Sequence, residues 1–277
     1  RALALHDLYR DHQYVSVSFG PHSVEALDLE TLEKIGMYAD ELDLGIQIHL
    51  QETSGELDRA LKKHGHSFVV LLKKIGLMNE RLQVVHAVHL TIEDKAILAE
   101  TNANVIHCPS SNLLLGSGIC PTKDLLELGV NVALGTDGSA SNNGIDLLSE
   151  AALAESLIKG IAQDASVYRA SNALGMTTIN GARALGLERR IGSLEVGKDA
   201  DFIAFDTRHP AIEPMMDPFR SIISNSGARC ISYVYAKGKP LIENGICVTT
   251  DLADLRERAA DWRARKVFRE IDGRAYN

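Results

Sequence analysis

The chain has 277 residues, of which 45% are hydrophobic and 24% charged, with 22 Gly and 7 Pro. This composition is typical of a folded globular protein and excludes a disordered or collagen-like chain. With 29 Lys and Arg against 37 Asp and Glu, the formal net charge is −8. Such a balance provides no basic surface for a polyphosphate backbone, so a nucleic acid polymer is not expected as a partner.

The first half of the chain alternates short apolar runs with stretches of helical period. Segments of five or six residues with β character occupy residues 14–19, 45–50, 82–87, 103–108 and 131–135. Between them, residues 28–43 carry apolar positions at helical spacing, and Asp28 is the expected N-cap. The alternation predicts a parallel α/β fold in which helices cover a sheet.

The second half begins helical and then changes character. Helices are predicted over residues 146–159, 165–174 and 177–185. Short strands follow at residues 201–205, 230–235 and 240–242, separated by Gly-containing turns. Residues 251–267 form a charged amphipathic pattern, which predicts a solvated helix.

Cysteine usage and hydropathy point to the cytoplasm. Cys108, Cys120, Cys230 and Cys247 form no C-x-x-C pair and lie within or beside apolar runs, as reduced thiols do. We expect no disulfide. No uninterrupted apolar stretch reaches the roughly 18 residues of a membrane helix, so a membrane is not expected as a partner.

Polar side chains gather where the predicted strands end. They are His22, His49, His86, Asn112 and Asp137. In a β/α barrel the carboxyl ends of the strands carry the catalytic residues. These positions are therefore the candidate site.

Two of these positions have a pattern that suggests metal chemistry. His49 precedes Glu52 in an H-x-x-E arrangement, which is not the H-E-x-x-H helix of zinc proteases; a hydrogen-bonded core histidine is the alternative for His49. Asp137 follows an apolar strand and enters a loop rich in Gly, Ser and Asn. A buried carboxylate needs a partner, and a cation is the natural one, although a helix-capping aspartate would explain it as well.

The other positions leave more than one interpretation open. His86 could ligate a metal, orient a water or donate to a backbone carbonyl. Strand alternation puts His86 and Val88 on one face and His89 on the other, so His89 is interpreted as structural. Asn112, in a polar loop after Pro109, could present its amide to a ligand or complete a turn.

An ordered series of motifs resembles the amidohydrolase superfamily, and more narrowly the 5-methylthioadenosine/S-adenosylhomocysteine deaminases with their chlorohydrolase and guanine deaminase relatives. The motifs are residues 19–22 (Phe-Gly-Pro-His), 49–53 (His-Leu-Gln-Glu-Thr), 85–90 (Val-His-Ala-Val-His-Leu), 107–112 (His-Cys-Pro-Ser-Ser-Asn), 135–138 (Gly-Thr-Asp-Gly) and 180–186 (Asn-Gly-Ala-Arg-Ala-Leu-Gly). The resemblance extends over nearly the whole chain to about residue 249. It departs from the family pattern at residues 23–26 and 113–114.

The resemblance implies a TIM-type (β/α)8 barrel with a small β-sandwich appendage. Residues 1–190 would be a partial metal-dependent hydrolase barrel, residues 191–250 the C-terminal half of the β-sandwich, and residues 251–277 a C-terminal helix. Only about five β/α units can be recognised, and the H-x-H pair of the family's first strand has no counterpart before His49. We therefore expect the sequence to be a fragment that lacks two metal ligands.

The resemblance also implies roles for individual residues. His49 and Asp137 would ligate one divalent metal, zinc in first place, with iron or manganese compatible with the mixed ligand set. His86 would hydrogen-bond the metal-bound water, Glu52 would shuttle protons, and Asp137 would receive a proton. His22, Asn112 and Glu52 would contact the substrate.

The expected function is metal-dependent hydrolytic deamination of an adenine-containing nucleoside, such as 5-methylthioadenosine or S-adenosylhomocysteine, with release of ammonia. One alternative is a guanine or other heterocycle deaminase, or a chlorohydrolase, on the same metal site. Another is a non-catalytic barrel remnant. The partner is a small-molecule substrate, and the assembly implied by the relatives is a homodimer.

Overall fold

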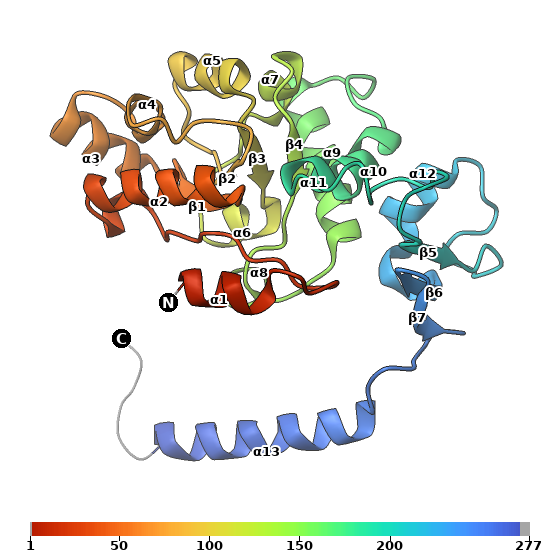
Figure 1. The fold of residues 1–277 in the computed structure, drawn as a ribbon. Coiled ribbons are helices and arrows are strands. Elements are labelled where there is room, and N and C mark those ends of the chain that lie inside the picture. Colours follow the sequence, from red (N-terminus) through yellow and green to blue (C-terminus); the bar gives the residue numbers. More distant parts are fainter. Residues whose placement is uncertain (1, 272–277) are drawn as a thin grey trace.

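A computed structural model describes the backbone of residues 2–271 and the side chains of these residues except 224–228 and 266–271. It is an α/β structure in which helices surround a parallel sheet (Figure 1). The strands of this sheet are β1 (Ile46–Leu50), β2 (Leu82–His86), β3 (Asn104–His107) and β4 (Val132–Leu134). The surrounding elements are α1 (Ala2–Tyr9), the 3-10 turn η1 (Val24–Ala26), α2 (Leu29–Leu42), α3 (Ser54–His64), α4 (Phe68–Lys74), α5 (Ile92–Thr101), α6 (Pro109–Leu114), α7 (Thr122–Glu127), α8 (Ser139–Asn142), α9 (Leu147–Ala162), α10 (Ala170–Thr177) and α11 (Ile179–Ala184).

The parallel sheet has the strand order β1-β2-β3-β4. Every residue of β2 and β4 is buried, which is the pattern expected of a parallel sheet covered on both faces. The core between sheet and helices includes Leu50, Leu72, Leu98 and Leu125, each fully buried. The predicted parallel α/β class is therefore confirmed, with observed strand bounds within a residue or two of the predicted ones.

The first predicted strand is wrong. Residues 14–18 form no regular strand, and only Phe19 and Ser23 make single parallel bridges, to Ile46 and His49 of β1. Residue Tyr14 instead lies beneath two lysine side chains, with its ring centroid 5.0 Å from Lys237 Nζ. Tyr14 at the start of the run thus makes a side-chain contact with a distant hairpin, and only Phe19 at its end pairs its backbone with β1.

Two helix predictions need correction. Asn112 lies in helix α6 and not in a loop, because Pro109 occupies the first turn, where a missing N–H costs nothing. Helix α10 begins at Ala170 and not near residue 165, since the Asp164 side chain accepts hydrogen bonds from the backbone and hydroxyl of Ser166 and closes a turn there. The predicted cap of α2 is present: Asp28 Oδ1 accepts from the Thr31 backbone N–H at 2.7 Å.

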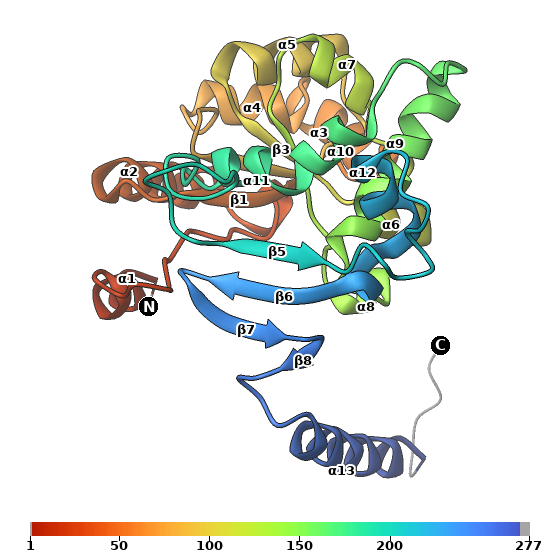
Figure 2. The same cartoon turned by 90° about the vertical axis from the view of Figure 1, so that its right-hand side faces the viewer.

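A second sheet lies beside the first and is antiparallel (Figure 2). Its order is β5 (Phe202–Phe205), β6 (Ile231–Ala236), β7 (Lys239–Glu243) and β8 (Ile246–Cys247). Three of these strands match the predicted ones, and β8 was not predicted. The connection from β5 to β6 contains α12 (Pro218–Arg220), a π-helical segment (Ser221–Ser226) and a 3-10 turn (Gly227–Cys230).

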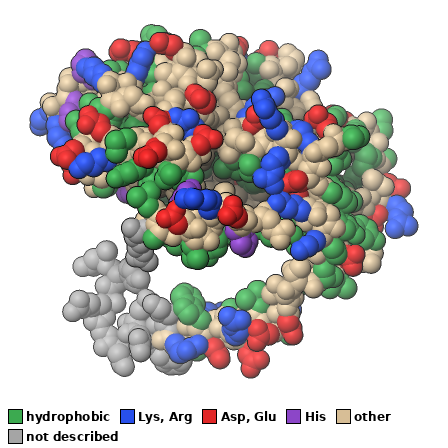
Figure 3. Space-filling model, viewed as in Figure 1, with side chains coloured by type: hydrophobic (Ala, Val, Ile, Leu, Met, Phe, Trp, Pro, Cys, Tyr) green, Lys and Arg blue, Asp and Glu red, His purple; other side chains and the backbone are tan. Residues whose placement is uncertain are grey.

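The last element, α13 (Leu252–Ile271), confirms the predicted tail helix. Its side chains are exposed from Leu252 to residue 265. Figure 3 shows an open space between this helix and the body of the molecule. None of the helices within residues 2–271 is both long and apolar enough to cross a bilayer.

The cysteines are unpaired thiols. Burial raises the pKa of the Cys108 and Cys120 thiols to about 12. They are therefore protonated, inert packing groups at neutral pH.

Candidate active site

The strand ends of the parallel sheet open into one cavity of about 380 Å³. Parallel pairing sets Leu50 of β1 beside His86 of β2, so the carboxyl ends of the strands meet at a common edge. The lining residues come from the predicted set and from neighbouring helices and loops: His22, Ser23, Glu25, His49, Glu52, Thr53, Glu56, Arg59, His86, Leu115, Asp137 and Ser141. Of the predicted site residues, only Asn112 is missing from this lining.

Three imidazoles follow one another along the cavity. The ring centroids of His22 and His49 are 4.9 Å apart, and those of His49 and His86 are 5.5 Å apart with nearly parallel planes. His49 Nδ1 lies 2.6 Å from the backbone carbonyl oxygen of His22. Because a carbonyl oxygen can only accept, Nδ1 carries the proton and Nε2 of neutral His49 keeps its lone pair. This is the tautomer that a metal-ligating histidine needs.

Glu52 and His86 face each other. Glu52 Oε2 is 3.8 Å from His86 Nε2, and the Ser117 hydroxyl donates to Glu52 Oε1 at 3.0 Å. On the other side of the ring, His86 Nδ1 donates to Asn112 Oδ1 at 2.8 Å. Asn112 is buried behind His86, and its Nδ2 has no hydrogen-bond partner. The structure thus places Asn112 where it orients His86; its predicted contact with the substrate remains a prediction.

The chain leaves the strands at this edge through left-handed backbone conformations. Gln51 has φ 55°, His86 φ 77° and Asp137 φ 57°. Residues other than glycine rarely adopt such angles, and they concentrate at functional sites where surrounding contacts enforce them. Here β2 ends at His86, which corrects the prediction that its strand alternation continues to Val88.

Glu56 was not predicted and holds the turn that carries Glu52. It is 7% exposed, and its two carboxylate oxygens accept the backbone N–H groups of Gln51 at 2.9 Å and Glu52 at 2.8 Å. Burial raises the pKa of Glu56 above its ordinary value, although both hydrogen bonds act in the opposite direction. The T-x-x-E spacing from Thr53 is a capping-box signature and could have revealed a residue that contacts this turn.

Asp137 is held by three donors. The hydroxyls of Ser111 and Ser141 donate to its Oδ2 at 2.6 and 2.8 Å, and the backbone N–H of Gly138 donates to its Oδ1 at 2.7 Å. Partial burial favours the protonated acid, but these hydrogen bonds outweigh it and keep the pKa of Asp137 below its usual value. The carboxylate is therefore ionised at neutral pH. Sequence reasoning missed Ser111 because it is 26 residues away and meets Asp137 only in the fold, and it missed Ser141, four residues on, because the short helix α8 that turns its hydroxyl back was not predicted.

The approach to Asp137 depends on Gly135. A Cβ at this position would lie 3.0 Å from Ile106 Cγ2 and 3.1 Å from Cys108 Sγ. Both distances are tighter than ordinary side-chain contacts, so a glycine is what lets the strand run this close to β3.

An ion pair borders the cavity at its mouth. Arg59 donates to both carboxylate oxygens of Glu25, each at 2.7 Å, and these bonds hold the pKa of Glu25 below its usual value. Glu25 belongs to the segment that departs from the family pattern. The charge of Arg59 is thus paired within the chain.

The donor set at the cavity fits a divalent metal in its chemistry. His49 offers a free imidazole nitrogen, and Asp137 offers an ionised carboxylate whose Oδ1 accepts one hydrogen bond and so keeps a lone pair available. Nitrogen and oxygen donors of this kind suit zinc as well as iron or manganese. Among the described residues, no group of three or more His, Cys, Asp or Glu side chains has the arrangement of a metal site.

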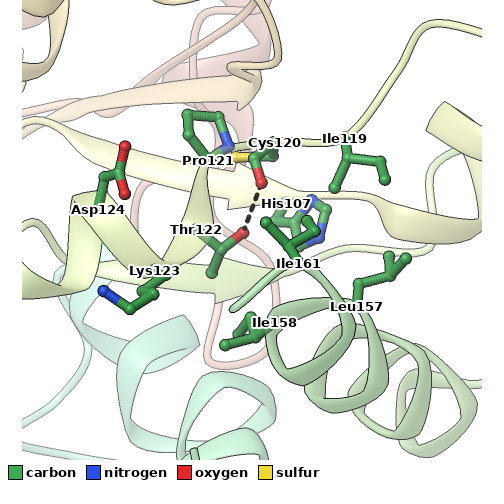
Figure 4. Close-up of a pocket in the computed structure, with 10 residues that line it drawn as sticks. All are labelled: His107, Ile119, Cys120, Pro121, Thr122, Lys123, Asp124, Leu157, Ile158 and Ile161. Atoms are coloured by element: carbon green, nitrogen blue, oxygen red, sulfur yellow. Dashed lines mark hydrogen bonds between the residues drawn. The ribbon is translucent and has the colours of Figure 1, made fainter. Parts of the chain in front are cut away.

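A smaller cavity of about 210 Å³ lies between α7 and α9, away from these residues (Figure 4). His107 stands in it among the apolar side chains of Ile119, Leu157 and Ile161. His107 is 2% exposed and its Nδ1 has no partner. Burial, with a smaller contribution from His86, lowers the pKa of His107 to about 3, so the ring is neutral. This cavity holds none of the predicted site residues.

Comparison with known proteins agrees with the fold. Residues 5–241 match the model of the amidohydrolase family. The chain is 41% identical over 265 residues to a 5-methylthioadenosine/S-adenosylhomocysteine deaminase of Teredinibacter turnerae, covering 96% of this chain and 60% of that protein. A protein of the same name from Moorella thermoacetica is 42% identical over 241 residues, with 87% and 56% covered.

Solved structures give the same picture. An adenosine deaminase from Xanthomonas campestris with bound zinc superposes with a TM-score of 0.93 at 38% identity, over 96% of this chain and 60% of that one. An atrazine chlorohydrolase from Arthrobacter aurescens, complexed with zinc, gives 0.89 at 26% identity, over 94% and 58%. The chain therefore shares its α/β fold with these two zinc-bound enzymes over almost its whole length. The chain belongs to the amidohydrolase family, and it spans about 60% of the length of the curated relatives it matches.

Proposed function

We propose that this protein hydrolytically deaminates an adenine-containing thionucleoside, with 5-methylthioadenosine and S-adenosylhomocysteine as the leading substrates. Water attacks the ring carbon that bears the exocyclic amino group; the exocyclic C–N bond breaks, the ring carbon becomes a carbonyl, and ammonia leaves. The geometry that carries the proposal is the single cavity in which Glu52 faces His86 next to the free Nε2 side of His49. The names of the relatives support the substrate class.

A divalent cation held by His49 and Asp137 supplies Lewis acidity, which lowers the pKa of a water molecule toward neutrality. His86 orients that water through Nε2, because its Nδ1 is engaged by Asn112 Oδ1. Asp137, ionised at neutral pH, accepts a proton on a carboxylate oxygen. These residues therefore position and deprotonate the attacking water.

Glu52 moves the remaining proton. Its Oε2 faces the cavity while Oε1 is fixed by the Ser117 hydroxyl, so one oxygen anchors the side chain and the other exchanges the proton. We propose that Glu52 gives its proton to the ring nitrogen next to the reacting carbon, which makes that carbon more electrophilic, and then takes up the second proton of the attacking water. The proton held by Asp137 passes to the amino group, which leaves as ammonia. His22, at the other side of His49, contacts the substrate.

The proposed function includes a larger architecture. We propose that the parallel sheet belongs to a (β/α)8 barrel and that β5 to β8 belong to a small β-sandwich. The TM-score of 0.93 to a zinc-bound deaminase supports this assignment.

The test measures metal and ammonia together on the purified protein. Elemental analysis of the protein after dialysis reports bound zinc, iron or manganese. A coupled assay then reports ammonia release from 5-methylthioadenosine, S-adenosylhomocysteine, adenosine and guanine, and a chloride assay covers a chlorotriazine. We expect near-stoichiometric metal and turnover of the thionucleosides ahead of adenosine.

Each other result points to a different function. Metal with turnover of guanine alone, or of the chlorotriazine alone, replaces the proposed substrate with that of the corresponding relatives. Full-length protein without metal and without turnover would refute the enzyme assignment and favour a non-catalytic barrel remnant.

A further inference from the structure

The hydroxyls that hold Asp137 are carried by two short helices with weak ends. Ser111 belongs to α6, which has six residues, and Ser141 to α8, which has four. Neither helix has a side-chain hydrogen bond at its N-cap. Helices this short are not stable on their own, so contacts from elsewhere must fix their positions.

A buried carboxylate on α9 makes such contacts with both helices. Glu150 is 2% exposed. Its Oε2 accepts the backbone N–H of Ser110 at 3.0 Å, and its Oε1 accepts Nδ2 of Asn142 at 2.9 Å. Each oxygen of Glu150 therefore binds the residue next in sequence to one of the two serines on Asp137.

Asn142 extends this connection to the strand end. Its Nδ2 also donates to the backbone carbonyl of Thr136 at 2.6 Å, so the same amide binds Glu150 and the residue before Asp137. The linkage thus runs from α9 through α8 to the turn that carries the carboxylate.

The burial of Glu150 requires an explanation. A buried carboxylate is costly unless it is paired or hydrogen-bonded. No ion pair with Glu150 occurs within the described part of the chain, so the two N–H donors on α6 and α8 are what compensate its charge. The partial positive charge at the N-terminus of α9 does not explain this burial, because it would stabilise an exposed acidic side chain as well.

We propose that Glu150 is a positioning residue: it fixes Ser111 and Ser141 on Asp137 Oδ2, and thereby the direction of the carboxylate toward the metal. The metal part of this inference rests on the proposed function. Glu150 does not line the cavity, and its hydrogen bonds run to α6 and α8, so its effect on Asp137 passes through these two helices.

The same helix contains a matched control. Glu155 is also on α9 and 3% exposed, but it pairs with Lys159 Nζ and Arg220, each at 2.6 Å, and contacts neither α6 nor α8. The variants Glu150→Gln and Glu155→Gln remove the same charge from the same helix at equal burial. Only the first disturbs the serines.

The chemistry of Glu150→Gln is specific. The new amide replaces one acceptor oxygen by a donor, which then meets either the Ser110 N–H or the Asn142 amide. If Asn142 turns its oxygen toward the new donor, its Nδ2 leaves Thr136. Either way, one bond of the linkage is lost.

The first readout is the zinc dissociation constant, measured by competition with a chelator on the purified protein and both variants. We expect Glu150→Gln to weaken zinc binding about 10- to 100-fold, the range found when residues that orient a metal ligand are changed. Glu155→Gln should stay close to the parent protein even if its thermal midpoint falls as much. Unchanged zinc binding in Glu150→Gln, or equal weakening in both variants, would overturn the proposal.

The second readout does not require metal. Hydrogen exchange followed by mass spectrometry should show faster exchange of the backbone amides of residues 110–114 and 139–142 in Glu150→Gln only. If the parent protein binds no zinc, the proposed function fails. The exchange pattern then tests the positioning role of Glu150 independently of zinc. Exchange identical to the parent would then refute its positioning role.

Discussion

The parallel and antiparallel sheets use the same unusual backbone conformation for different purposes. In the antiparallel sheet, left-handed residues Lys237 and Asn244 each precede a glycine of positive φ and form the tight turns between strands. In the parallel sheet, Gln51, His86 and Asp137 adopt it at the strand ends that line the cavity. A turn requires only the local chain, whereas the site requires neighbouring strands to enforce the conformation.

The two regions also differ in burial. Strand β2 is buried throughout, while every residue of β6 is only half-buried. All of the candidate site residues come from the parallel region. Tight packing on both faces is what can hold imidazoles and carboxylates in fixed orientations.

The largest expected effect concerns the site itself. Replacement of Glu52 by glutamine keeps the shape but removes the exchangeable proton, so kcat for deamination should fall about 10²- to 10⁴-fold. The matched change in the antiparallel sheet is Glu243→Gln, in β7, where the side chain accepts from the Tyr235 hydroxyl. The steady-state rate of ammonia release, measured on the two variants at equal zinc content, checks this prediction. Full activity in Glu52→Gln would show that Glu52 takes no part in the mechanism.

The next effect compares the packing of the two sheets. Leu82 in β2 is 1% exposed, and Leu241 in β7 is half-buried. Truncation of Leu82 to alanine should cost about 2–5 kcal/mol of unfolding free energy, since it leaves a cavity in the core. The Leu241→Ala variant should lose about 1 kcal/mol. Urea unfolding measures both, and equal losses would mean that the sheets are packed alike.

A third effect appears in acid and belongs to the buried His107. Since burial lowers its pKa from 6.5 to about 3, the unfolded chain binds the proton first as the pH falls through this interval. The stability contributed by neutral His107 is complete above pH 6.5 and declines by about 1.4 kcal/mol per pH unit below it.

Replacement of His107 by leucine, which suits its apolar surroundings (Figure 4), should therefore flatten the acid side of the stability profile. The exposed His66→Leu variant serves as the control. Urea midpoints at pH 7, 6 and 5 give the slope. A slope that is unchanged in His107→Leu would show that His107 is not buried as neutral imidazole.

The smallest effect tests a single helix end. Thr91 and Asp94 form a reciprocal capping box at the start of α5, so Thr91→Ala should cost about 1 kcal/mol. Thr207→Ala, at an exposed turn beside the antiparallel sheet, should be neutral within about 0.5 kcal/mol. The thermal unfolding midpoints of the two variants test this prediction. Equal midpoints would indicate that the capping box adds nothing to the stability of the protein.

Much of the fold could be predicted because it depends on local patterns. The apolar runs that became β1 to β4, the helical period of α2 and the cap at Asp28 are properties of neighbouring residues. The run at residues 14–19 has the same local signal but forms no regular strand, because only Phe19 at its end pairs its backbone with β1.

In the candidate site, too, some features follow from the local sequence and others depend on tertiary contacts. The sequence by itself determined that polar side chains lie at or just past the ends of the apolar runs: His49 near the end of β1, His86 at the end of β2 and Asp137 shortly after β4. Only the tertiary structure decided what holds them: Asn112 behind His86, Ser111 and Ser141 on Asp137, Glu56 beneath Glu52 and Glu150 beneath both short helices. The physical reason is that a hydrogen bond acts over about 3 Å and ignores distance along the chain, so its partners are chosen by packing and not by spacing in the sequence.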